Sequence, residues 1–207
     1  MSIVDDMIDF EWRFFDKVHN EGGRASCQDN FETFSLMRRS QFLAWDDATR
    51  AAYMSDLLDA AQRCRNPVQE KYARMMASTA PEQYAAFAHL LPAMDEPERA
   101  LIEEMVAIQL RWREDFARDW PQMSAQARLI HTHEDTAWGT SFETYLRGEL
   151  GSYSAATRRA YRHMLDGYLS RGDNLTTETM RQTALLYGYS GLEAAEARLQ
   201  ETTGGGA

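Results

Sequence analysis

Residues 48–70, ATRAAYMSDLLDAAQRCRNPVQE, match residues 156–178, ATRRAYRHMLDGYLSRGDNLTTE, at a constant offset of 108. The two segments are identical at nine of 23 positions, far more than unrelated segments share. A match of this length indicates two copies of one structural unit. The identical pairs are Ala48/Ala156, Thr49/Thr157, Arg50/Arg158, Ala52/Ala160, Tyr53/Tyr161, Leu57/Leu165, Arg63/Arg171, Asn66/Asn174 and Glu70/Glu178.

Two shorter matches upstream keep the same order along the chain. Residues 31–34 (FETF) match residues 142–145 (FETY) at an offset of 111. Residues 12–13 (WR) match residues 112–113 at an offset of 100. The repeat therefore extends well beyond the longest match.

These matches divide the chain into two tandem pseudo-repeats, residues 1–95 and 96–200, followed by a tail, residues 201–207, that we expect to be disordered. Two copies are too few to stack as a solenoid. We expect them to close on a shared core as one compact domain, with a ligand-binding cleft where they meet.

The apolar residues follow a helical period, with steps of three and four that place them on one face of a helix. Alternating patterns typical of strands are nearly absent, and helix-forming residues fill most segments. The sequence thus predicts an all-α helical bundle. The clearest apolar stripes are Ile3, Val4, Met7, Ile8, Trp12, Phe15 and Val18, and Leu101, Met105, Ile108, Trp112 and Phe116.

Composition narrows the class of protein further. The 207 residues include 22 basic and 32 acidic side chains, a net charge of −10, and 44% apolar residues, enough for a sizeable core. An acidic surplus argues against binding to nucleic-acid phosphates. No apolar run approaches the length of a membrane span, and two cysteines cannot form a disulfide framework. We expect a cytoplasmic protein that binds neither nucleic acid nor membranes.

Three runs resemble a bacterial family known as a domain of unknown function. They are residues 20–28 (NEGGRASCQ), 70–76 (EKYARMM) and 140–150 (TSFETYLRGEL), within a similarity that covers most of the chain. Some members of that family are joined to a nucleotidyltransferase-like domain. The resemblance implies a cytoplasmic bacterial protein, and it implies that such a partner would be a separate polypeptide. It supplies no reaction.

Glu32 and Glu143 occupy equivalent places in the two repeats and are the candidate catalytic residues. Brought together across a cleft, one carboxyl group can act as acid and the other as base. The alternative is structural, because Asp29-x-x-Glu32 and Thr140-x-x-Glu143 have the spacing of a capping box. Both interpretations stay open at this point.

Arg24, Cys27 and Gln28 form a polar cluster in a glycine-containing loop and are candidate substrate-binding residues. An arginine can hold a carboxylate or phosphate bidentately, and a glutamine adds a directional hydrogen bond. The alternatives are an arginine that ties the two repeats together and a buried, inert cysteine.

Glu70, Tyr145 and Arg147 complete the candidate substrate-binding set. Glu70 follows Asn66, a predicted N-cap, and as a first-turn acid it can simply favour the helix dipole. Arg147 lies four residues after Glu143 and can form an ordinary helical ion pair with it.

His131, His133 and Glu134 have metal-ligand side chains at close spacing and give a weak alternative, a metal site. A polar loop that caps the next helix is the simpler interpretation. No cofactor is evident in the sequence, and a metal ion is left as the alternative.

The leading prediction is an enzyme that performs acid–base chemistry, of the lyase, isomerase or hydrolase type, on a small polar anionic metabolite in the cleft between the repeats. Arg24 and Gln28 would anchor this substrate while Glu32 and Glu143 transfer protons. Two alternatives are a non-enzymatic helical adaptor that docks on a partner, such as a nucleotidyltransferase-like protein, and a metal-dependent carboxylate/histidine site.

Overall fold

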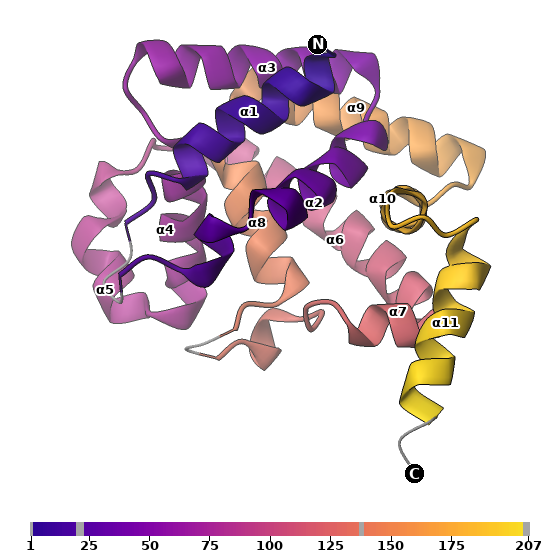
Figure 1. Ribbon diagram of the computed structural model, residues 1–207. Coiled ribbons are helices and arrows are strands. Elements are labelled where there is room, and N and C mark those ends of the chain that lie inside the picture. Colours follow the sequence, from indigo (N-terminus) through magenta and orange to yellow (C-terminus); the bar gives the residue numbers. More distant parts are fainter. Residues whose placement is uncertain (1, 20–22, 137–138, 205–207) are drawn as a thin grey trace.

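The computed structural model describes residues 2–19, 23–136 and 139–204, and it confirms the all-α prediction (Figure 1). The described residues form eleven α-helices and, in place of strands, a single isolated bridge between Thr136 and Gly139. The helices are α1 (Ile3–Phe15), α2 (Phe31–Leu43), α3 (Asp47–Gln62), α4 (Pro67–Thr79), α5 (Pro81–Phe87), α6 (Glu96–Asp119), α7 (Pro121–Ala125), α8 (Phe142–Ser152), α9 (Ala155–Arg171), α10 (Leu175–Leu186) and α11 (Leu192–Gly204), with short 3₁₀ helices η1 (Ser26–Asp29), η2 (Ala88–Leu90) and η3 (Thr132–Glu134).

The helices pack into a bundle in which sequence-distant elements lie side by side. α1 packs on α2, α3 and α4, and α6 packs on α8, α9 and α10. Three further contacts join these two groups: α3 with α9, α4 with α8, and α2 with α10. The α3 and α9 helices run along the same edge of the bundle in Figure 1.

One main core holds the bundle together. It includes the fully buried Met7, Phe42 and Leu57 from residues 1–95 and Met105 and Leu165 from residues 96–200. A second, smaller core lies where α6, α7, α10 and α11 meet, with Phe116 at its centre.

Asparagine caps begin two of the helices, as the sequence predicts. Asn66 accepts a hydrogen bond from the Gln69 amide at 3.0 Å, and Asn174 accepts one from the Thr177 amide at 3.0 Å. A side-chain oxygen at this position satisfies one of the amides that a helix leaves unpaired at its start. Pro67 occupies the first turn of α4, where its missing N–H costs nothing.

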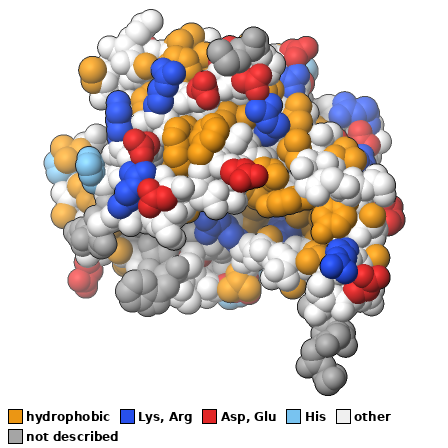
Figure 2. Space-filling model, in the orientation of Figure 1, with side chains coloured by type: hydrophobic (Ala, Val, Ile, Leu, Met, Phe, Trp, Pro, Cys, Tyr) orange, Lys and Arg blue, Asp and Glu red, His pale blue; other side chains and the backbone are white. Residues whose placement is uncertain are grey.

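The C-terminal helix α11 continues to residue 204, so the described part of the predicted disordered tail, residues 201–204, is helical. Residues 205–207 lie outside the described residues. Within the described part of the chain, no helix is both long and apolar enough to cross a membrane. On the face drawn in Figure 2, acidic and basic side chains are interspersed and do not gather in a patch of one sign.

Candidate functional site

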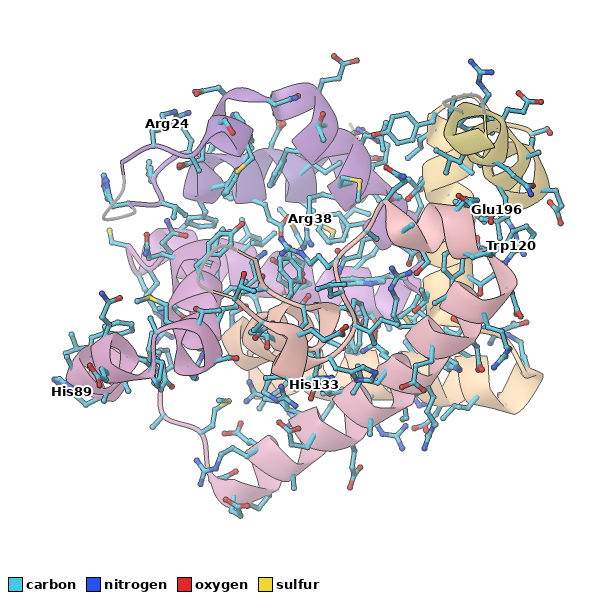
Figure 3. The ribbon with its side chains drawn as sticks, turned by 90° about the horizontal axis from the view of Figure 1, so that it is seen from below. Arg24, Arg38, His89, Trp120, His133 and Glu196 are labelled. Atoms are coloured by element: carbon cyan, nitrogen blue, oxygen red, sulfur yellow. The ribbon has the colours of Figure 1, made fainter. Side chains whose placement is uncertain are left out.

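The loop that contains Arg24, Cys27 and Gln28 is fastened to the end of α1. Arg24 forms ion pairs with Asp16 at 2.6 Å and Asp29 at 2.7 Å and lies at the edge of the molecule (Figure 3). The buried Gln28 amide donates hydrogen bonds to the carbonyls of Phe15, the last residue of α1, and of Val18, and Cys27 is exposed. The polar groups of Arg24 and Gln28 are therefore occupied by the chain itself.

Glu32 and Glu143 stand in the first turns of α2 and α8, but the predicted capping boxes are wrong. The caps lie one residue later than predicted: Asn30 accepts from the Thr33 amide at 3.0 Å, and Ser141 accepts from the Thr144 amide at 3.2 Å. That shift moves both glutamates out of the position from which they could bond the cap amide.

Glu143 instead accepts hydrogen bonds from the Thr132 amide and from Arg147, each at 2.8 Å. Burial opposes ionisation, but Arg147 and the Thr132 amide outweigh it and lower the pKa of Glu143. Neither Glu143 nor Glu32 lines either of the two pockets described below. Their proton-transfer pairing stays a prediction.

Arg147 forms the i,i+4 ion pair with Glu143 that the alternative interpretation predicts, and it also holds Glu103 bidentately at 2.7 and 2.9 Å. The Tyr145 hydroxyl accepts a hydrogen bond from Lys71 at 2.9 Å. These residues join α8 to α6 and α4.

Of the predicted metal ligands, Glu134 is occupied by local hydrogen bonds. The Glu134 carboxylate accepts from the amides of Ile130 and His131 at 3.1 and 2.8 Å. The rings of His131 and His133 are stacked, with 5.4 Å between their centroids. Nε2 of His131 lies 3.3 Å from Oε1 of Glu114. No group of three metal-ligating side chains forms within residues 2–19, 23–136 and 139–204.

A buried ionic cluster, which the sequence analysis did not predict, lies in the centre of the bundle (Figure 3). Arg38 forms two hydrogen bonds to Glu11, one of them 2.6 Å long, and one to Glu149 at 2.9 Å. The hydroxyl groups of Tyr53 and Tyr153 complete it, donating to Glu11 and Glu149 respectively.

Burial alone would raise the pKa of Glu149, but Arg38 and Lys71 outweigh it and hold this pKa at about 2. The two buried carboxylates, Glu11 and Glu149, are thus matched by two buried cations. A signal for the cluster exists in the sequence, because Glu11 and Glu149 interrupt otherwise apolar helical stripes. None of the side-chain atoms of this cluster is among the buried atoms that lack a hydrogen-bond partner, as expected of a satisfied polar network within a core.

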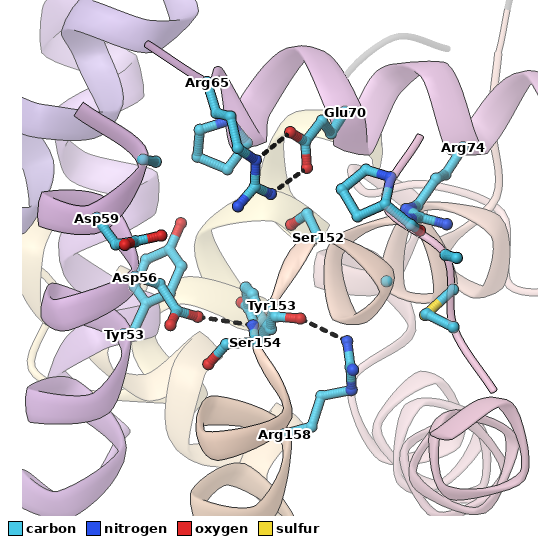
Figure 4. A pocket seen from close by; sticks show the side chains of 16 residues that line it. Tyr53, Asp56, Asp59, Arg65, Glu70, Arg74, Ser152, Tyr153, Ser154 and Arg158 are labelled. Carbon is cyan, nitrogen blue, oxygen red and sulfur yellow. Dashed lines mark hydrogen bonds and ion pairs between the residues drawn. The ribbon is translucent and has the colours of Figure 1, made fainter. Parts of the chain in front are cut away.

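A pocket of about 170 Å³ opens between α3, α4 and the junction of α8 with α9 (Figure 4). We call it the arginine pocket, because Arg65, Arg74 and Arg158 line it. Of the predicted substrate-binding residues, Glu70 lies there. The other polar residues of the lining are Tyr53, Asp56, Asp59, Ser152, Tyr153 and Ser154.

The three arginines differ in how their charges are neutralised. Arg65 holds Glu70 bidentately at 3.0 and 2.7 Å. Arg158, 3% exposed, donates to Glu98 at 2.5 Å and to a backbone carbonyl. Arg74 donates to the Pro92 carbonyl at 2.7 Å and has no carboxylate partner among the described residues.

Two buried nitrogen atoms of this pocket lack hydrogen-bond partners, Nε of Arg74 and Nε of Arg158. Burial lowers the pKa of Arg74, and the nearby charges of Arg158 and Arg65 lower it further, against the opposite effect of Tyr84 and Glu70. A partly buried cation without a counter-charge is an unfavourable arrangement in the free protein.

Two glycines of α8 allow α4 to approach closely. A Cβ at Gly151 would lie 2.8 Å from Cδ of Arg74, and a Cβ at Gly148 would lie 2.9 Å from the Lys71 carbonyl oxygen. The side chain of Arg74 can therefore lie across α8 only because residue 151 has no side chain.

A second pocket, of about 410 Å³, adjoins the first, since Arg74 and Met94 line both. We call it the apolar pocket. It lies among α4, α5, α6 and α8, and Ala77, Tyr84, Ala100, Ile102 and Gly148 form much of its wall.

A family model described as "Protein of unknown function (DUF4125)" matches residues 1–197. The chain belongs to this family. The DUF4125 match spans both pockets and the buried ionic cluster. Neither a curated protein nor a solved structure matches the chain.

Proposed function

We propose that the protein binds a small anionic metabolite in the arginine pocket. The observation that carries this proposal is Arg74, which lines the pocket beside Arg65 and Arg158 and has no carboxylate partner among the described residues. A partly buried cation without a counter-charge is unfavourable. A carboxylate or phosphate bound in the pocket would bring the missing negative charge and accept hydrogen bonds from the guanidinium group.

Acidic side chains in the same pocket offer a site for the acid–base chemistry predicted from the sequence. Asp56 lines the pocket, and its Oδ2 accepts from the Ser154 amide at 2.8 Å, which fixes the orientation of the carboxylate. Asp59 is paired with Arg63 at 2.7 Å, and Glu70 with Arg65. We therefore assign the proton-transfer role of the proposed lyase, isomerase or hydrolase to Asp56, in place of the pairing of Glu32 with Glu143.

We also propose that the scaffold arose by duplication of one helical unit, with α1–α4 matching α6, α8, α9 and α10. Paired contacts support this. The Asn66 side chain donates to the Phe14 carbonyl at 2.8 Å, and Asn174 donates to the Trp112 carbonyl at 3.0 Å. The Tyr53 hydroxyl donates to Glu11, and Tyr161 donates to Gln109 at 3.0 Å.

A reciprocal contact between the proposed copies adds to this support. The Asp46 amide lies 3.4 Å from the sulfur of Met164, and the Ser154 amide lies 2.8 Å from Asp56. Asp46 and Ser154 are 108 residues apart, as are Asp56 and Met164. Such an exchange of partners is typical of two-fold symmetry. On this proposal, the arginine pocket lies beside the contact between the copies.

The converging polar groups of the arginine pocket favour a small-molecule function over the predicted alternative of a protein-docking adaptor. The predictions of a cytoplasmic location and of a nucleotidyltransferase-like partner stay proposals that rest on the sequence alone.

Isothermal titration of the protein with inorganic phosphate, sulfate and small dicarboxylates at fixed ionic strength tests the proposal. We expect at least one of these anions to bind, and Arg74→Gln to weaken its binding about tenfold or more, because charge-assisted hydrogen bonds are lost. Arg39→Gln, which removes a surface arginine paired with Asp5, is the matched control and should bind normally. Equal binding by all three proteins would contradict the proposal, as would no binding to the wild type.

A further inference from the structure

The arginine pocket and the apolar pocket share part of their walls, and neither alone has the properties of a complete ligand site. Small-molecule sites usually enclose about 300–1,000 Å³ and combine an apolar lining with a few polar groups. The arginine pocket, at about 170 Å³, is smaller than this range. The apolar pocket, at about 410 Å³, falls within this range.

We propose that the two pockets form one bipartite site for an amphiphilic anion, with a phosphate or carboxylate group in the arginine pocket and an aromatic or aliphatic group in the apolar pocket. This inference rests on the proposed function and names the class of ligand. Its basis is the adjacency of the two pockets, which have Arg74 and Met94 as common lining residues.

Apart from Arg74 at the boundary, the charged residues of the apolar pocket neutralise one another, which leaves its remaining wall to accept an uncharged group. Arg147 holds Glu103 bidentately, and Arg99 pairs with Glu96 at 3.0 Å. These residues lie on α6 and α8, and their ion pairs provide no unpaired charge for a second anion.

The wall left for the ligand is apolar and partly aromatic. The rings of Tyr84 and Phe87, both on α5, pack edge-on with 5.7 Å between their centroids, and this contact supports the Tyr84 ring. Met94 stands at the junction of the pockets, and the flexible thioether side chain of methionine adapts to varied apolar shapes. An aromatic or branched aliphatic group fits such a wall better than a second polar group does.

Arg74 lies at the boundary between the two parts of the site. Its guanidinium group is held at the Pro92 carbonyl, while its methylene groups lie against Gly151. The charged end can thus contact the anionic group of a ligand while the stem contacts the apolar group, as is common for long cationic side chains.

The test compares inorganic phosphate with phenyl phosphate by isothermal titration at equal ionic strength and at a pH where both are mainly dianionic. For the wild type, we expect phenyl phosphate to bind at least about tenfold more tightly, because the ring is removed from water. Ala100→Phe should abolish this advantage and leave phosphate binding unchanged. Ala100 is exposed on α6 and lines the apolar pocket but not the arginine pocket.

Ala107→Phe is the matched control, since Ala107 is also exposed on α6 but lines neither pocket, and it should keep the full advantage of phenyl phosphate. Ala77→Phe, at another exposed position of the apolar pocket, replaces Ala100→Phe if circular dichroism shows that the latter does not fold. Equal binding of the two anions by the wild type would overturn the bipartite site and leave the arginine pocket standing, as would an advantage that persists in the filled variants. Binding of neither phosphate would overturn the bipartite site, and if sulfate and the dicarboxylates also fail to bind, the proposed function is overturned as well.

Discussion

On the proposed duplication, the arginine pocket corresponds to a region 108 residues later in the sequence, and the two regions differ in their side chains. Ala60 lines the pocket, whereas the matching residue is Tyr168, whose hydroxyl donates to the Ala44 carbonyl at 2.7 Å. Arg74 is matched by Gln182, so the unpaired cation is also replaced. On this proposal, side-chain size and charge at the matching positions, Ala60 and Tyr168 or Arg74 and Gln182, set the two regions apart.

The centre of the bundle shows a second kind of difference. At the offset of 111 that matches residues 31–34 with residues 142–145, Arg38 corresponds to Glu149, and the two side chains form an ion pair at 2.9 Å. Like charges at these two positions would repel one another in a region without water. The opposite charges instead join residues 1–95 to residues 96–200. Four predictions test these comparisons, beginning with the largest expected effect.

Arg38→Met should lower the free energy of unfolding by about 3–5 kcal/mol, because it leaves the carboxylates of Glu11 and Glu149 buried without their arginine. Urea unfolding followed by circular dichroism measures the change. The neighbouring variant Arg39→Met is the control: its ion pair with Asp5 is one third exposed and should contribute less than about 1 kcal/mol. Similar losses in both variants would show that the buried cluster does not join the two halves.

The stability difference between the wild type and Glu149→Gln should shrink on acidification. The pKa of Glu149 in the folded protein, about 2, lies below its ordinary value of 4.5, so its stabilising contribution is complete above about pH 5 and is lost as the pH falls toward 2. The corresponding change is on the order of 3 kcal/mol. Urea unfolding at pH 6, 4 and 3 measures it, and a difference that does not vary with pH would contradict the assignment.

Gly148→Ala should destabilise the protein by about 1–3 kcal/mol, since its Cβ would meet a backbone oxygen of α4 that cannot move independently. Gly151→Ala meets only the movable side chain of Arg74 and should leave stability nearly unchanged. It should nevertheless weaken anion binding, because Arg74 is displaced. Thermal unfolding and phosphate titration separate the two effects. Undiminished binding by a folded Gly151→Ala protein would argue against the role of Arg74.

Asn66→Ala and Asn174→Ala should each lower the free energy of unfolding by about 1–2 kcal/mol, and the two losses should be nearly equal. Each substitution removes a helix cap and a side-chain hydrogen bond to a backbone carbonyl. Urea unfolding of both variants measures the losses. A difference above about 1 kcal/mol would count against the proposed equivalence of α4 and α10, since independent sites with the same contacts should lose similar amounts.

The helices and several of their ends could be predicted from the sequence because the determinants are local. Asn66 and Asn174 cap the helices that follow them, as local rules require. The same rules misplaced two other caps by one residue, where Asn30 and Ser141 compete with the polar residues before them. Adjacent polar side chains can each serve as a cap, and the packing of the whole helix decides between them.

The arginine pocket could not be predicted from the sequence. Arg65, Arg74 and Arg158 reach it from three helical regions, and the sequence does not reveal that Arg74 lacks a carboxylate partner while Arg65 has one. The loop arginine that seemed the better anion-binding candidate, Arg24, satisfies its charge with Asp16 and Asp29. The partners of a long polar side chain depend on how the helices pack, so they cannot be read from the sequence around it.

The most direct test is the anomalous diffraction of a crystal soaked in selenate, a tetrahedral dianion whose selenium atom can be located without a binding assay. We predict an anomalous peak inside the arginine pocket, placed so that selenate oxygens accept hydrogen bonds from the guanidinium group of Arg74, beside Arg158. An empty arginine pocket in a crystal that holds selenate at other arginines would contradict it.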